Sequence, residues 1–74
     1  MPKLRRLSGK EVCQILATQG FVKVRQKGSH IMMQKSEKGT TITVPVPDHN
    51  ELKIGTLNGI IRQSGVSRSL FETL

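Results

Sequence analysis

The sequence has no tryptophan or tyrosine, and its aromatic residues are two phenylalanines. It has one cysteine, Cys13, which excludes an internal disulfide. One cysteine and two histidines provide no zinc-ligand spacing, so we expect no metal site and no small-molecule cofactor. No apolar run approaches the ~20 residues of a membrane span. The charged N-terminus precedes no apolar segment, so we expect no signal peptide, no membrane contact and a cytoplasmic location.

Acidic residues are also scarce. Twelve Lys and Arg face five Asp and Glu, which gives a formal net charge of +7 on 74 residues. This length predicts one small domain over residues 1–74, with room for a single core and none for a deep cofactor cleft. Such a surplus of positive charge favours a polyanionic partner, most often nucleic acid. The alternative is a domain that is basic without having such a partner.

The ends of the chain have helical patterns. Ser8 and Glu11 are spaced as a capping box, and the following apolar stripe predicts a helix from about Gly9 to Gln19, capped by Gly20. A second apolar stripe predicts a helix over about 53–63, with Gly65 as its cap. A short helical turn is expected after it, with Ser67 as the N-cap and Val66 and Phe71 spaced as a hydrophobic staple.

Three alternating segments lie between the helices. Residues 21–26 alternate with Val22 and Val24 predicted inward and Lys23 and Arg25 outward. A turn at Lys27-Gly28 separates them from a second strand, and a turn at residues 36–39 separates that strand from a third over residues 40–46. Pro45 and Pro47 limit the third strand to a sheet edge or end it. The segments predict an antiparallel meander.

The resulting fold class is α+β, with the order α-β-β-β-α and a short C-terminal helix. Only one sheet face is apolar, so both long helices are expected to pack on it. The opposite, open face is expected to carry polar and basic side chains: Lys23, Arg25, His30, Met32, Gln34, Thr41 and Thr43. This topology and size match the double-stranded-RNA-binding-domain fold, which reads RNA mainly by shape and phosphate contacts.

His30 is the residue best placed for chemistry, because a turn puts its titratable imidazole at the start of a strand, on the open face. Two interpretations of His30 remain: it is a general acid or base in catalysis, or it is an exposed strand residue without a function. Lys23 and Arg25 either contact a polyanion or only form a solvated face that discourages pairing with another strand. Cys13 is expected to be a small buried side chain, and His49 an inert loop residue.

Short segments in order along nearly the whole chain carry a family resemblance. They are Ser8-Gly9-Lys10-Glu11-Val12, Gly20-Phe21, Gln26-Lys27-Gly28-Ser29-His30, Thr43-Val44-Pro45-Val46, Gly55-Thr56-Leu57 and Ile60-Ile61-Arg62-Gln63-Ser64-Gly65. In this combination the chain resembles the HicA-type mRNA interferase toxins of HicA–HicB toxin–antitoxin pairs. It departs from them after the Val-Pro-Val of the third strand. Many members have a histidine soon after this point, but here Pro47-Asp48 stands between Val46 and His49. No role is therefore assigned to His49.

The resemblance implies a fold like that of double-stranded-RNA-binding domains, one catalytic histidine in Gly-Ser-His, here His30, and a HicB-like antitoxin that covers the toxin. A metal-independent endoribonuclease acting on mRNA is then expected. Lys23, Arg25, Lys27, Gly28 and Ser29 are the candidate RNA contacts. A rival reading is a non-catalytic RNA-binding module of the same fold, which leaves His30 unexplained. A purely structural interaction domain would leave the charge unexplained.

Overall fold

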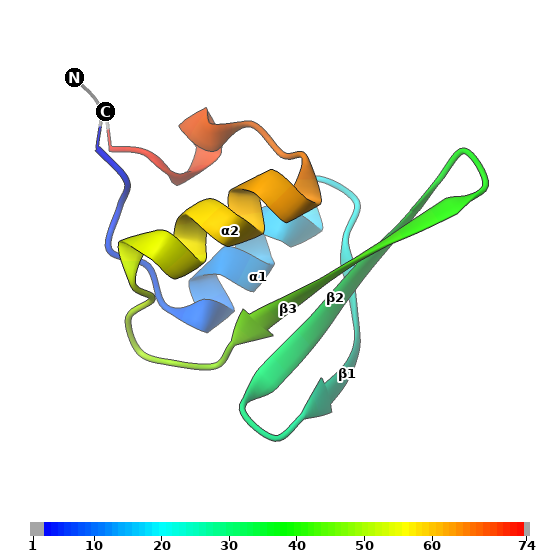
Figure 1. Cartoon of the computed structure of the whole chain (residues 1–74), viewed down its shortest axis with the longest axis horizontal. Helices are drawn as coiled ribbons and strands as arrows, with labels where there is room; N and C mark the ends of the chain where they lie inside the picture. Colours follow the sequence, from blue (N-terminus) through cyan, green and yellow to red (C-terminus); the bar gives the residue numbers. More distant parts are fainter. Residues whose placement is uncertain (1–2, 74) are drawn as a thin grey trace.

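Two α-helices cover one face of a three-stranded antiparallel sheet (Figure 1). The computed structural model describes residues 3–73; residues 1, 2 and 74, at the ends of the predicted domain, lie outside this range. The elements are α1 (Gly9–Thr18), β1 (Val22–Lys27), β2 (His30–Glu37), β3 (Thr40–Pro47), α2 (Ile54–Ser64) and a 3₁₀ helix, η1 (Arg68–Phe71). The sheet order is β1-β2-β3, so β2 is central. The predicted α-β-β-β-α order and antiparallel sheet are confirmed.

The start of α1 is fixed by the predicted capping box. The backbone N–H of Glu11 donates to Ser8 Oγ at 3.1 Å, and the N–H of Ser8 donates to Glu11 Oε1 at 2.9 Å. Two backbone donors that the first helical turn leaves unpaired are thereby satisfied. The helix ends at Thr18, one residue before the predicted end, and Gly20 follows with a φ of 94°, which favours glycine.

Two tight turns join the strands. Gly28 and Ser29 form the first, and the positive φ of 59° at Gly28 suits the first central position of a type II′ turn. Lys27 is therefore the last residue of β1, not a turn residue as predicted. Lys38 and Gly39 form the second turn with φ angles of 47° and 81°, as in a type I′ turn. The β2–β3 hairpin extends well past the helices as an arm (Figure 1).

The core lies between the helices and one sheet face. Its buried side chains are Leu7, Val12, Leu16, Phe21, Ile31, Met33, Val44, Val46, Leu52, Leu57, Ile60 and Phe71. Along β2, buried Ile31 and Met33 alternate with His30, Met32 and Gln34, as predicted. Because neighbouring residues of a strand point to opposite faces, His30 and Gln34 lie on the open face, the sheet face opposite the helices.

The predicted sides of Val22, Lys23 and Val24 in β1 are wrong because the strand contains a β-bulge, whereas Arg25 lies on the open face as predicted. Lys23 pairs with buried Met33, and the register then shifts so that Arg25 pairs with Met32. The extra residue, Val24, reverses the alternation. Lys23 therefore lies on the helix side, whereas Val22, which pairs with Gln34, lies on the open face. Val22 and Val24, predicted inward, are 60% and 46% exposed.

Pro45 and Pro47 lie on β3, which is an edge strand as predicted. They pair with Met32 and His30, at positions where a missing N–H removes no bond to β2. The outer edge of β3 lacks these two donors, so it is a poor template for another strand.

The second helix starts one residue after the predicted position and has no side-chain cap at Lys53. It ends at Ser64, one residue after the predicted end, and Gly65, whose φ is 70°, is its cap as predicted. Ser67 occupies the N-cap position of η1, but its hydroxyl bonds to that of Ser69 rather than capping the turn. Buried Phe71 anchors the C-terminal segment. Within residues 3–73, no helix is long and apolar enough to span a membrane.

Candidate functional site

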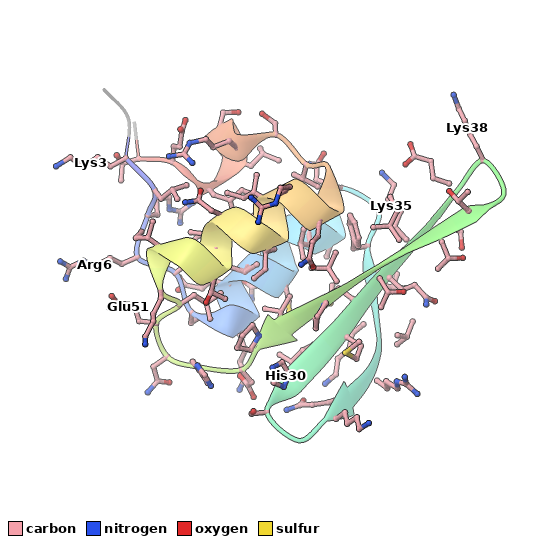
Figure 2. All side chains as sticks on the ribbon, in the orientation of Figure 1. Lys3, Arg6, His30, Lys35, Lys38 and Glu51 are labelled. Atoms are coloured by element: carbon pink, nitrogen blue, oxygen red, sulfur yellow. The ribbon has the colours of Figure 1, made fainter. Side chains whose placement is uncertain are left out.

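His30 opens the central strand at the end of the sheet where β1 and β2 are joined (Figure 2). It pairs with Lys27 of β1 on one side and with Pro47 of β3 on the other. Its side chain is exposed. The imidazole thus projects from a strand held on both sides, so its backbone is fixed while the ring is accessible to a large ligand.

The backbone around His30 is held by three elements. The N–H of Asp48, just after β3, donates to the Ser29 carbonyl at 2.6 Å, which ties the end of β3 to the β1–β2 turn. The N–H of Gly9 donates to the His49 carbonyl at 2.9 Å, which joins the start of α1 to the same segment. Gly9 is buried there, and a Cβ on it would overlap the carbonyl oxygen of Pro47. The helix therefore supports the strand next to His30.

Two cations share the open face with His30. Lys27 is its direct cross-strand neighbour, and Arg25 pairs with Met32, the next open-face residue of β2. Directly opposite Cβ atoms in a sheet are ~5 Å apart, and successive same-face residues of a strand are ~7 Å apart. A phosphate at the imidazole would lie within reach of both long side chains. Gly28 and Ser29, in the turn, lie directly before His30.

The structure separates Lys23 from this group. Its Nζ donates to Gln26 Oε1 at 3.2 Å, and Gln26 Nε2 donates to Asp48 Oδ2 and to the Gly28 carbonyl, both at 3.3 Å. Gln26 pairs with buried Ile31, so this polar chain runs along the helix side of β1. The prediction that Lys23 lies on the open face with Arg25 is therefore wrong, because the bulge separates them.

The two charged residues of this polar chain, Asp48 and Lys23, affect the pKa of Cys13 on α1. Burial raises the pKa of the Cys13 thiol, Asp48 raises it further, and Lys23 acts in the opposite direction. The side chain packs against the core as predicted, but it is half-buried and not fully buried. The influence of Lys23 on its pKa agrees with a lysine that lies on the helix side of the sheet.

Gln26 and Asp48 are the residues near the site that the sequence did not indicate. They connect the β1–β2 turn to the end of β3 through a pair of side chains 22 positions apart. Their proximity follows from the strand register, for which the sequence carries no local signal. His49 is exposed beside them, and its carbonyl group holds Gly9. Within residues 3–73, no three His, Cys, Asp or Glu side chains are grouped to hold a metal ion.

The model of one protein family, described as the HicA toxin of bacterial toxin–antitoxin, matches residues 9–66. The matched range runs from the start of α1 to just beyond α2 and includes His30, Lys27 and Arg25. No curated protein and no solved structure matches the chain.

Proposed function

The chain belongs to the HicA toxin family, and from this we propose that it is an endoribonuclease that cleaves mRNA with His30 as its catalytic residue. The observation that carries the proposal is the position of His30: exposed, at the start of the central strand, with Lys27 directly opposite. A toxin of this family acts within a toxin–antitoxin pair, so an antitoxin partner is part of the proposal.

The proposed reaction uses the RNA's own 2′-hydroxyl as the nucleophile. Imidazole changes its protonation near neutral pH, so it can accept the 2′-hydroxyl proton or donate one to the departing 5′-oxygen. The 2′-oxygen forms a bond to the adjacent phosphorus as the bond to the 5′-oxygen breaks, which leaves a cyclic phosphate and a 5′-hydroxyl. Positioned acid–base catalysis contributes ~10²–10⁴-fold to the rate.

Lys27 and Arg25 are assigned to the charge that develops on the phosphate. Both lie on the open face with His30, and cationic groups aimed at a developing negative charge lower the barrier. Gly28 and Ser29 are assigned to the RNA backbone, because no side chain at Gly28 blocks close approach and the Ser29 hydroxyl can donate a hydrogen bond. Lys23 is left out of this set because it faces α1.

The antitoxin is proposed to be HicB-like and to act by covering the open face. Arg25 and Lys27 lose water when that face is covered, so the contacting surface needs carboxylates to compensate them. Diethylpyrocarbonate labelling tests this with an internal reference, since His49 is also exposed. Bound antitoxin should protect His30 more than His49. Equal labelling of His30 with and without antitoxin would mean that the inhibitor binds elsewhere.

A growth assay tests the activity in cells. Expression of the wild-type chain without its antitoxin should arrest growth, and co-expression of the antitoxin should restore it. His30→Ala should be harmless at the same protein level, whereas His49→Ala should remain toxic. A wild-type chain that accumulates without slowing growth would contradict the proposed toxin, and a toxic His30→Ala protein would contradict the proposed catalytic residue.

A further inference from the structure

The open face has a hollow of about 360 Å³ over the middle of the three strands. Its lining residues come from all three strands: Val24, Arg25, Met32, Gln34 and Thr43. The volume lies near the lower end of the ~300–1,000 Å³ typical of small-molecule sites. The chemistry proposed above uses Arg25 for the phosphate and leaves the other four residues without a role.

The polar wall of the hollow has a fixed hydrogen-bonding pattern. Gln34 Nε2 donates to Thr43 Oγ1 at 3.1 Å across the β2–β3 pair. This bond uses one of the two amide N–H groups and holds the side chain in place. Among residues 3–73, the other N–H and the carbonyl oxygen of the Gln34 side chain have no further partner. A donor and an acceptor side by side form the pair with which an amide side chain reads the edge of a nucleobase.

The other walls suit the flat face of a base. Val24 is 46% exposed and Met32 is half-buried, so apolar surface is open to solvent in the hollow that Arg25 also lines. Unpaired RNA bases are bound by stacking on apolar, aromatic or guanidinium surfaces combined with hydrogen bonds to their edges. The bulge places Val24 and Arg25 on the same face, where Arg25 is the cross-strand neighbour of Met32. Bulges next to functional sites often redirect side chains in this way.

The distance to His30 fits an RNA strand that lies along β2. His30, Met32 and Gln34 are successive open-face residues, so Gln34 lies ~14 Å from His30 along the strand. We propose that the hollow is a nucleobase subsite and that Gln34 is its specificity-determining residue, binding a base near the phosphate at His30. This inference rests on the proposed ribonuclease function. The net charge of +7 favours RNA over a protein side chain as the occupant.

Base preference in binding tests the subsite independently of cleavage. The His30→Ala protein is titrated with labelled single-stranded oligoribonucleotides that differ in one base, and affinity is read by fluorescence anisotropy. One base should be preferred, and adding Gln34→Ala should reduce that preference by roughly 5- to 150-fold, the discrimination of one bidentate base contact. Gln34→Glu keeps the size but replaces the donor with an acceptor, so it should change which base is preferred. Gln63→Ala, a matched change on exposed α2 surface, should leave the preference intact.

Mapping of cleavage sites in a long RNA provides the second readout. The wild-type chain should cut at a restricted set of sequences, and folded Gln34→Ala, verified by circular dichroism, should cut at a broader set. Unchanged preference in both assays would overturn the subsite while leaving the ribonuclease intact. Altered antitoxin affinity with unchanged RNA preference would identify a protein group as the occupant and also overturn it. A wild-type chain that fails to cut but retains Gln34-dependent binding would contradict the proposed function alone.

Discussion

Replacing Gly9 with alanine should destabilise the fold and disturb the site together. A Cβ at this position would overlap the Pro47 carbonyl oxygen and lie 3.0 Å from its carbonyl carbon and 3.1 Å from Cα of Asp48. All three atoms are backbone, so no side chain can rotate away. Either the start of α1 or the end of β3 must move, and Pro47 is the residue that pairs with His30.

The cost follows from the contacts that such a movement breaks. Overpacking at a buried position costs ~1–3 kcal/mol, and loss of the Gly9–His49 backbone hydrogen bond adds ~1 kcal/mol. The expected decrease in the free energy of unfolding is therefore about 2–4 kcal/mol. At about 4–8 °C per kcal/mol for a domain of this size, the melting temperature should fall by at least ~8 °C.

Urea and thermal unfolding followed by circular dichroism provide the measurement, with Gly59→Ala as the matched control. Gly59 lies within α2, and a Cβ there would have no neighbour within 4 Å apart from the adjacent helix backbone, so alanine should stabilise the protein by ~0.5–1 kcal/mol. Cleavage by Gly9→Ala should also decrease at temperatures where the variant is still folded. A Gly9→Ala protein as stable as the wild type would refute the close seating of α1 on the end of β3.

Three further predictions concern charge. Hydrogen bonds with Ser8 lower the pKa of Glu11 below its ordinary 4.5, so its stabilising effect is present above that pH and is lost as the pH falls through the folded-state pKa; the melting-temperature difference between wild type and Glu11→Ala should therefore shrink as the pH is lowered below 4.5. Asp48→Asn should lower the pKa of Cys13 and Lys23→Ala should raise it, which the pH dependence of iodoacetamide alkylation measures. An unchanged pKa in Lys23→Ala would contradict the position of Lys23 on the helix side of the sheet. The log of RNA affinity of His30→Ala should fall linearly with log salt, and Lys27→Ala should reduce the slope by about one unit, whereas Lys23→Ala should leave it unchanged.

Local signals in the sequence were enough for the elements that local contacts determine. The capping box at Ser8 and Glu11 is formed within one turn of helix, and Gly20 and Gly65 end the helices through their own backbone angles. The alternation in β2 and β3 is regular, so the open-face position of His30 was predicted correctly.

The face of β1 was not predictable because it depends on pairing. Val22 and Val24 alternate with cations as they would on a buried strand, but β1 lies at a sheet edge and contains a bulge. One extra residue reverses the strand's alternation, and only the register with β2 determines where that residue lies. The same register determines the Gln26–Asp48 hydrogen bond and the residues that line the hollow, so neither could be predicted from the sequence.

Cleavage of RNA by purified His30→Ala and His49→Ala proteins tests the central claim most directly. Both histidines are exposed, so neither substitution opens a cavity, and circular dichroism verifies the fold of each variant. The account predicts that wild type and His49→Ala cut a defined single-stranded RNA at the same sites and similar rates without added metal, while His30→Ala loses cleavage and still binds. Full activity in folded His30→Ala would contradict the assignment of His30 as the catalytic residue.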